Sequence, residues 1–466
     1  MKSFLITIII GVAIYCWLSE TSRGQKRKKA LSPQEEWKSK TLKYVEEVNE
    51  FVARGYKEGW EKVGKEPAEP DRKHLVKSLL EAIRKANAQG NLDELRELWP
   101  PAQGPLIETL QEKGQEISEL CILPDDSLLA RVGAYYEEAK TVIIRGDDVT
   151  SLPEIGLFGR GPNRRYFALQ KAHGVAVIDG WGGPQTSLCP WPTGLEELPA
   201  KLKAKPWVKA PVPERIIPFP CGTKVLMIGS CGIYVLSPSG AKRLLPCNEM
   251  LIEDAEEFIE GDEHNQLIPY ISMAHGAISP DGKQIAIGHQ DSAHLVFNNE
   301  LEKIAHIGNL SSYPHYALFN KSNSKLALNS CHFYNGVTIA VPTNIIDGLI
   351  TEEYDEDIRT PTVEAHSRIY AGTSTGDNFI VGDAYGYVRA FSDEGRHLWQ
   401  QMVGSSVGAI DISVDGKTMV VATCAGFISI FKMNAGRQAV HQIGDGNHEE
   451  IRRWIFWKDE PKALIW

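Results

Sequence analysis

Residues 275–298 have the sequence HGAISPDGKQIAIGHQDSAHLVFN, in which three short apolar runs alternate with polar turns. The runs are 277–278, 285–287 and 295–297. Residues 279–282, SPDG, form a turn signal, because proline fixes φ, aspartate bonds to its own backbone and glycine adopts positive φ without strain. Strands this short and this close together pair in antiparallel fashion, since parallel strands need a long crossover. The stretch therefore predicts three adjacent antiparallel strands.

The same arrangement recurs along the chain. When the units are aligned on the second apolar run, the equivalent positions are Tyr166, Leu226, Ile285, Leu326, Phe379, Met419 and Ala463. Neighbouring positions lie 60, 59, 41, 53, 40 and 44 residues apart. A period of about 40–50 residues with several strands in each unit is typical of the blades of a β-propeller, and the longer intervals indicate insertions in loops.

The seventh unit is incomplete, because only 453–457 and 463–466 supply strands after the sixth unit. Two apolar runs upstream, 129–134 and 141–144, have no other partner. We expect these runs to complete the seventh blade, so that N- and C-terminal strands close the ring by pairing. Closure removes exposed sheet edges, which could otherwise pair with other chains. The expected fold is mainly β, with a seven-bladed β-propeller over residues 126–466.

The turn SPDGK at 279–283 is echoed by SVDGK at 413–417. On these motifs the sequence resembles the WD40-like seven-bladed β-propellers over about residues 127–466. It departs from the family pattern because no unit has a Trp-Asp dipeptide at the end of its third strand; the sequences there include IDGW at 178–181, FNN at 297–299 and FKM at 431–433. The resemblance indicates a divergent, bacterial-type propeller and implies binding more than any reaction, since one fold serves many functions.

Composition excludes several classes of function. The net charge of −10 disfavours a nucleic-acid partner, because phosphate binding needs a basic surface. The eight cysteines include no CxxC pair, so a zinc ribbon is not expected. Nothing in the sequence calls for a metal or a cofactor.

Residues 1–30 contain an apolar run, FLITIIIGVAIYCWL at 4–18, followed by basic residues. The run spans only ~23 Å as a helix, against a hydrocarbon core of ~30 Å, so it lies between a short membrane anchor and a signal sequence. The heavier positive charge after the run favours an anchor with the propeller in the cytoplasm, and no good cleavage site is present. The alternative is export to the periplasm.

Residues 31–125 are expected to be helical. Ser32, Pro33 and Glu35 form a helix start signal. Further helices are expected at about 71–90, 92–98 and 106–120. We expect their apolar stripes to pack on one another or on the side of the propeller, although a partner could cover them instead.

The resemblance also implies where a site would lie. In propellers, the loops between second and third strands and the entries to first strands open on one face, near the central channel. At those positions this sequence has polar side chains suited to a ligand or partner: His275, His289, Asp291, His315, His332, His366 and Asp383. Imidazole also suits transition metals, but no local spacing of ligands supports a metal site. Alternatively, these residues bind no ligand and only form ordinary hydrogen bonds within the loops and the core.

The sequence thus predicts a non-catalytic, membrane-tethered scaffold that binds a protein or peptide through the loops of the channel mouth. The alternative is an enzyme, or a small-ligand or metal-binding propeller, with a His/Cys/Asp site at the ring centre. An enzyme would need a nucleophile, base or metal that converge at one point. An inhibitor of a bacterial toxin would also suit the acidic charge.

Overall fold

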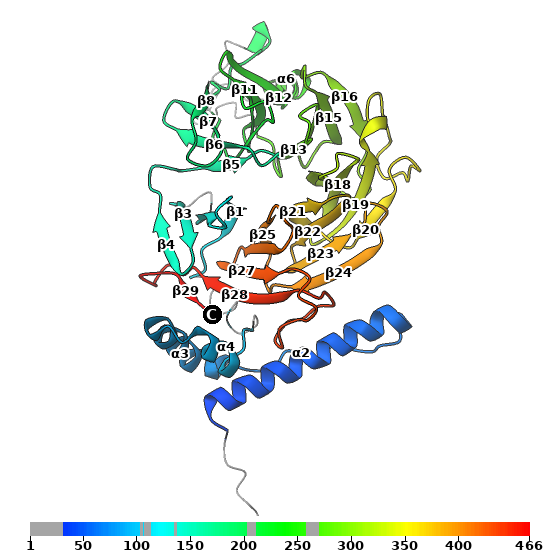
Figure 1. The fold of residues 1–466 in the computed structure, drawn as a ribbon. Helices are drawn as coiled ribbons and strands as arrows, with labels where there is room; N and C mark the ends of the chain where they lie inside the picture. Colours follow the sequence, from blue (N-terminus) through cyan, green and yellow to red (C-terminus); the bar gives the residue numbers. More distant parts are fainter. Residues whose placement is uncertain (1–30, 103–105, 107–112, 135–137, 203–210, 258–269) are drawn as a thin grey trace, which may run out of the picture.

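The structure is a computed structural model, and it describes residues 31–102, 106, 113–134, 138–202, 211–257 and 270–466. Its strands form seven antiparallel sheets arranged in a ring, with the first strand of each sheet toward the centre (Figure 1). Three helices, α2 to α4, lie along one side of this ring. The predicted seven-bladed β-propeller is confirmed.

Each blade is a sheet of four strands in sequence order, and the last blade has a fifth. The strands are β1 (Ile117–Ile122), β2 (Leu128–Val132), β3 (Lys140–Arg145) and β4 (Asp148–Ser151) in blade one; β5 (Phe158–Arg160), β6 (Tyr166–Lys171), β7 (Gly174–Asp179) and β8 (Gln185–Pro190) in blade two; β9 (Arg215–Pro218), β10 (Val225–Gly229), β11 (Gly232–Ser237) and β12 (Gly240–Leu245) in blade three; β13 (His275–Ile278), β14 (Gln284–Gly288), β15 (His294–Asn298) and β16 (Lys303–Ile307) in blade four; β17 (Tyr313–Phe319), β18 (Lys325–His332), β19 (Asn335–Pro342) and β20 (Thr362–Ala365) in blade five; β21 (Ile369–Thr375), β22 (Asn378–Asp383), β23 (Tyr387–Phe391) and β24 (His397–Met402) in blade six; and β25 (Val407–Ile412), β26 (Thr418–Thr423), β27 (Phe427–Lys432), β28 (Glu449–Ile455) and β29 (Leu464–Ile465) in blade seven.

The turn that first indicated the fold has the expected chemistry. The Ser279 hydroxyl donates to Asp281 Oδ1 at 2.7 Å and accepts the backbone N–H of Gln284 at 2.9 Å, while Gly282 has a φ of 73°. The turn at 413–417 repeats this pattern. Six of the seven aligned positions lie in the second strand of a blade, as predicted.

The predicted closing blade is wrong. Residues 117–151 form a complete blade of their own, and β28 and β29 belong to the sheet of β25 to β27. The aligned position Ala463 therefore precedes a fifth strand. The expected helix at 106–120 is wrong at its C-terminal end, because residues 117–120 belong to the strand β1. Residues 107–112 of that expected helix lie outside the described residues. A tight turn joins β1 to β2, with Leu123 N–H donating to the Ser127 carbonyl at 2.8 Å, so blade one needs no strand from the other end of the chain.

The segments that flank the ring still meet. An antiparallel bridge joins Gly114 to Trp457, and Gln115 N–H donates to the Phe456 carbonyl at 3.1 Å. This contact joins the residues just before β1 to the residues just after β28. It does not form a shared blade. Ring closure therefore rests on contacts between blade one and blade seven and not on a shared sheet.

The helices precede the ring in sequence. They are α2 (Pro33–Glu58), α3 (Val76–Gln89) and α4 (Leu92–Leu98), with a 3₁₀ turn at Lys73–Leu75. Connections within the ring contain a further helix, α6 (Asn248–Glu257), and 3₁₀ turns at Ala200–Leu202 and Thr343–Ile345. The predicted start of α2 is confirmed, because Ser32 and Glu35 form a reciprocal capping box with Pro33 in the first turn.

The helical apolar stripes pack on one another and on blade seven. Trp37 is fully buried, and its ring lies 6.2 Å from Trp99 and 6.3 Å from Trp466. Indole Nε1 of Trp466 donates to the Trp99 carbonyl at 2.7 Å. The cluster also holds Leu79 and Ile83 of α3, and it joins the helices to the strands β27 to β29. This is the packing expected from the sequence.

Among the described residues, no helix combines the length and the apolar character that crossing a membrane requires. The predicted anchor, residues 4–18, lies outside the described residues.

One carboxylate joins three blades at the point where the ring closes. Asp411, on the first strand of blade seven, is buried and accepts Ile122 N–H of blade one at 2.7 Å. It also pairs with Arg160 at 2.7 Å and Arg164 at 2.8 Å, both from blade two. Burial alone would raise the pKa of Asp411, but the two arginine charges and their hydrogen bonds outweigh burial and hold its pKa below the ordinary value.

Replacing this carboxylate should weaken the whole ring. We expect Asp411→Asn to lower the free energy of unfolding by about 3 kcal/mol at neutral pH, because two partly buried guanidinium groups lose a fully buried counter-charge. The pKa of Asp411 is depressed, so its contribution is complete above the unfolded pKa of about 3.9 and is lost as pH falls through the folded value. Urea unfolding of wild type and variant at pH 7 and pH 3 measures both effects. The exposed Asp347→Asn is the control, and equal stability of the two variants at pH 7 would contradict the prediction.

Candidate functional site

The loops at the predicted mouth can be followed best in blades five and six. Because strands alternate in direction, the loops between second and third strands and the connections between blades lie at the same end. Backbone bonds join them: Arg368 N–H donates to the Tyr334 carbonyl at 3.1 Å, and Ala384 N–H to the Arg368 carbonyl at 3.0 Å. The loops of blades five and six thus form one continuous surface at the mouth.

Three buried histidines lie together in blade four, of which the sequence singled out His275 and His289. The third, His294, has its ring 5.5 Å from that of His275 in an edge-on arrangement. Each ring has one buried nitrogen without a hydrogen-bond partner among the described residues: Nε2 of His275, Nε2 of His289 and Nδ1 of His294. Burial lowers the pKa of all three, that of His275 to about 4. They are neutral at physiological pH.

His315 holds an arginine in place at the mouth. Its Nδ1 lies 2.7 Å from the Ile369 carbonyl, and its Nε2 lies 3.1 Å from Nη2 of Arg368. Burial and then the Arg368 charge lower the pKa of His315 to about 3, so the ring is neutral and Nε2 accepts from the guanidinium. Arg368 also donates to the Phe333 carbonyl at 3.2 Å and lies over the ring of Tyr370. In the described part of the chain, no carboxylate forms an ion pair with Arg368.

Beside this arginine, aromatic side chains project from the mouth. Phe333, Tyr334 and Tyr385 are 72%, 57% and 49% exposed. The rings of Tyr334 and Tyr385 are 5.6 Å apart, although the residues come from different blades. His332 is exposed next to them, 4.6 Å from the Phe333 ring, and stacks on Tyr313 at 6.1 Å. We call these five residues the aromatic rim.

The rim depends on an unusual turn. His332 pairs with Asn335 at the end of the β18–β19 hairpin, so Phe333 and Tyr334 are the two residues of its loop. Two-residue hairpin loops usually contain glycine or asparagine, because positive φ is required. Phe333 has a φ of 52°, which is rare for a large side chain and unfavourable by about 1–2 kcal/mol.

The remaining predicted residues do not join the rim. Asp383 is fully buried; its Oδ1 accepts the N–H groups of Tyr385 and Tyr387 at 2.9 Å each, and its Oδ2 pairs with Arg389. It therefore shapes the turn that presents Tyr385. Asp291 is exposed on the blade-four loop, and its N–H contacts His289 Nδ1 at 3.3 Å. His366 is exposed and lines a separate pocket beside the ring.

Sequence reasoning missed His294, Phe333, Tyr334, Arg368 and Tyr385. His294 immediately precedes an apolar run, and a polar residue there gives no signal of a site. The signal for the rim was two aromatics at the centre of a hairpin, between the apolar strands 325–332 and 335–342. That signal is visible only once the register of the hairpin is known.

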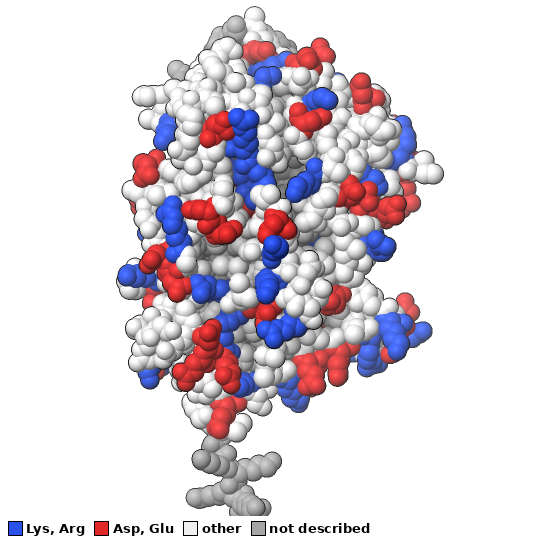
Figure 2. Space-filling model, in the orientation of Figure 1, with Lys and Arg blue, Asp and Glu red and all other residues white. Residues whose placement is uncertain are grey.

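The central channel contains charged pairs toward the end opposite the mouth. A hollow of about 260 Å³ is bordered by first strands, including Glu119, Arg160 and Arg215. Glu119 accepts from Arg215 at 3.0 Å. On the face drawn in Figure 2, acidic and basic side chains are intermingled rather than gathered by sign. No His, Cys, Asp or Glu cluster of three or more with metal-binding geometry occurs among the described residues.

No family model and no curated protein matches this chain. Among solved structures, the β-propeller domain of Cps50 (Swd1) from Myceliophteria thermophila is similar, at 12% identity and a TM-score of 0.43, over 66% of this chain and 92% of that one. KlHsv2 with loop 6CD replaced by a Gly-Ser linker is similar at 10% identity and a TM-score of 0.38, over 69% and 93%. The fold is established by the seven sheets themselves. The chain is a seven-bladed β-propeller.

The buried histidines should make blade four sensitive to acid. The folded pKa of His275, about 4, lies below the unfolded value of about 6.5, so its neutral form stabilises the fold above pH 6.5 and this stability is lost as pH falls toward 4. Between pH 7 and pH 4.5, the unfolding free energy of His275→Asn should fall by roughly 2–3 kcal/mol less than that of wild type. Urea unfolding at both pH values tests this, with the exposed His173→Asn as control. An unchanged pH dependence in His275→Asn would rule out the assignment.

Proposed function

We propose that this chain is a non-catalytic scaffold that binds a protein or peptide partner through its aromatic rim. A rigid ring with variable loops suits that role, because the sheets fix the loops while the loop residues determine what is bound. Two observations support the rim as the contact surface: the turn that exposes Phe333 and Tyr334, and the charge of Arg368 beside them.

The turn is the observation that carries the proposal. A sequence selected only for folding would place glycine at position 333, where φ is 52°. Instead the chain keeps a phenylalanine that is strained and 72% exposed. Strain of this kind persists at functional sites, and aromatic residues dominate the binding energy of protein interfaces.

Arg368 suggests the chemistry of the partner. Its guanidinium is oriented by His315 and Tyr370, and it has no ion-pair partner in the described part of the chain. An oriented arginine beside aromatic rings is suited to a carboxylate, with which it forms two parallel hydrogen bonds. We therefore propose a partner segment with an apolar or aromatic side chain next to an acidic one.

A small-ligand site at the ring centre is the second candidate. The three unpartnered imidazole nitrogens of His275, His289 and His294 favour it, because buried polar atoms usually have partners. A nucleophile and base in contact are absent from this group of side chains, so the ligand would be bound and not transformed.

We also propose that residues 4–18 tether the ring to a membrane, with the ring on the cytoplasmic side. The support is the apolar run and the basic residues that follow it. Export remains the other outcome.

The double variant Phe333→Gly/Tyr334→Ser separates binding from folding. Glycine followed by serine suits a two-residue hairpin, so we expect the variant to be as stable as wild type or up to about 1 kcal/mol more stable. Removing two exposed aromatics should reduce recovery of the partner about tenfold or more. Crosslinking in intact cells, purification of the full chain and quantitative mass spectrometry measure recovery; thermal unfolding measures stability.

The control is Leu188→Ser/Ile451→Ser, which removes exposed apolar residues from the strands β8 and β28 on the side of the ring. A protein recovered with wild type and control but lost with the rim variant supports the proposal. A protein recovered equally with all three, or none recovered with wild type, contradicts it.

Membrane fractionation tests the tether. The full-length chain is expected in the membrane fraction and to resist extraction with alkaline carbonate, while a chain lacking residues 1–30 should be found with the soluble proteins. Protease added to spheroplasts should leave the ring intact if it faces the cytoplasm. A full-length chain in the soluble fraction would show that the run does not anchor it, and digestion in spheroplasts would show export.

A further inference from the structure

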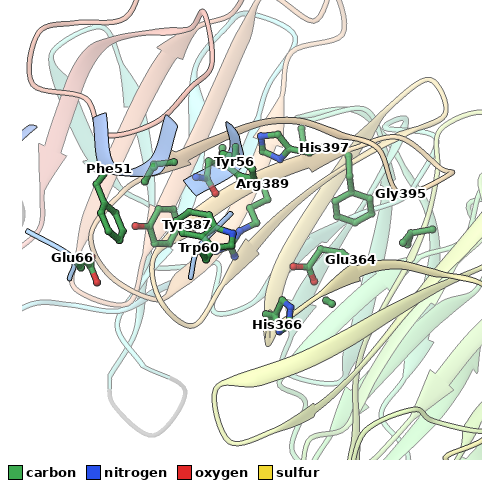
Figure 3. A pocket seen from close by; sticks show the side chains of 16 residues that line it. Phe51, Tyr56, Trp60, Glu66, Glu364, His366, Tyr387, Arg389, Gly395 and His397 are labelled. Carbon is green, nitrogen blue, oxygen red and sulfur yellow. The ribbon is translucent and has the colours of Figure 1, made fainter. Parts of the chain in front are cut away.

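A second pocket lies beside the ring, and none of the rim residues lines it. It is about 590 Å³ in volume and is bordered by α2 with the segment after it on one side, and by β20, β23 and β24 on the other (Figure 3). The helix is fixed there by a paired amide contact: Asn49 Nδ2 donates to the Gln442 carbonyl at 3.0 Å and its Oδ1 accepts Gly444 N–H at 3.0 Å. This contact fixes α2 to the connection between β27 and β28 of blade seven.

Aromatic rings form the helical wall. Trp60 lies 5.4 Å from Tyr56 and 6.0 Å from Phe51, and Tyr56 stacks on His397 at 5.0 Å. Tyr56 and Trp60 are 51% and 52% exposed, so their remaining faces are open. The indole folds back over Gly55, where an added Cβ would lie 2.3 Å from the ring. A glycine inside a helix lowers helix stability by about 1 kcal/mol, and here it allows the tryptophan to occupy the pocket wall.

The opposite wall contributes a carboxylate with an unused oxygen. Glu364 Oε1 accepts from the Ser367 hydroxyl at 2.6 Å, while Oε2 is buried and has no partner among the described residues. In Figure 3 the Glu364 carboxylate points toward the interior, across from Trp60. A buried polar atom without a partner is unfavourable by about 1–3 kcal/mol unless a ligand bonds to it.

The charge of the lining favours a cation. Its formal charges are Glu66, Glu364 and Arg389. The arginine is already paired with Asp383 and donates to the Ser367 hydroxyl at 2.6 Å, so its charge is compensated from the blade side. Two carboxylates remain. Once Glu364 is ionised, both carboxylates repel an anion, and a purely apolar ligand would leave Glu364 Oε2 unbonded.

We propose that this side pocket binds an organic cation, whose ammonium group bonds to Glu364 while its carbon atoms pack on Tyr56 and Trp60. Aromatic faces attract ammonium groups through the ring quadrupole, and a carboxylate adds a charge-assisted hydrogen bond. A pocket of about 590 Å³ holds more than an ammonium group alone, so the cation carries an alkyl chain or is part of a larger molecule. Both a free amine and a lysine side chain of a partner have this chemistry. The site is separate from the rim and does not depend on it.

Cation binding should depend on pH. Burial raises the pKa of Glu364 to about 7, with Ser367, Arg389 and Thr338 acting in the opposite direction. A bound cation favours the ionised carboxylate, so affinity should increase from pH 6 to pH 8. The other titratable groups that face the pocket are His366, His397, Glu66, Tyr56 and Tyr387. Burial raises the pKa of both tyrosines, so they stay neutral throughout this range.

Titration of the purified full chain with choline, spermidine and a lysine-rich peptide with blocked ends, followed by Trp fluorescence and calorimetry at constant ionic strength, tests the proposal. We expect saturable binding of at least one probe, weakened about tenfold or more by Trp60→Ala and by Glu364→Gln. Binding to Glu364→Gln should also lose its pH dependence between 6 and 8, whereas His366→Asn should retain it. Binding of the small amines identifies a free cation as ligand; binding of the peptide alone identifies a lysine side chain.

Matched controls are Glu353→Gln and Tyr354→Asn, an exposed carboxylate and an exposed aromatic in the loop after β19. Both should bind like wild type. The proposal is overturned if no probe saturates, if inorganic phosphate binds instead, or if Trp60→Ala and Glu364→Gln bind as tightly as wild type while circular dichroism shows them folded. None of these results bears on the rim, which is tested by partner recovery.

Discussion

Ring closure in this protein depends on the carboxylate of Asp411. Every other junction joins blades that follow one another in sequence, but the junction of blade seven with blade one brings together residues 289 positions apart. Asp411 meets this constraint with hydrogen bonds to Ile122, Arg160 and Arg164. Gly408 helps by close approach, since a Cβ there would lie 2.2 Å from the Ile117 carbonyl. The ring therefore closes through polar bonds and backbone packing, without the shared blade that its sequence suggested.

The parts of the fold that depend on local sequence signals could be predicted, and the parts that depend on long-range pairing could not. The SPDGK turn and the short apolar runs beside it act within a hairpin, so the positions of six second strands could be predicted correctly. The strand β1 was missed because its apolar pattern also suits a helix and nothing local decides between the two. The fifth strand of blade seven was misplaced because its partner is set by long-range pairing.

The candidate site shows the same division. The histidines were found because the position of a loop in a repeat implies where its residues lie. The rim was missed because an aromatic pair within an apolar region normally indicates core, and only the pairing of His332 with Asn335 shows that Phe333 and Tyr334 form the loop. Arg368 stands out because no carboxylate among the described residues forms an ion pair with it. A sequence does not show which charged side chains are paired.

The helices and blade seven share one apolar cluster, and this has a consequence for biosynthesis. Trp37, Leu79 and Ile83 leave the ribosome long before Phe427, Ile455 and Trp466, against which they are buried. Throughout translation of the ring, the apolar stripes of α2 and α3 lack their final partner. Such surfaces aggregate readily, and chaperones exist to cover them. The nascent chain therefore has a long interval in which its first helices need protection, and this interval ends only when the last blade is complete.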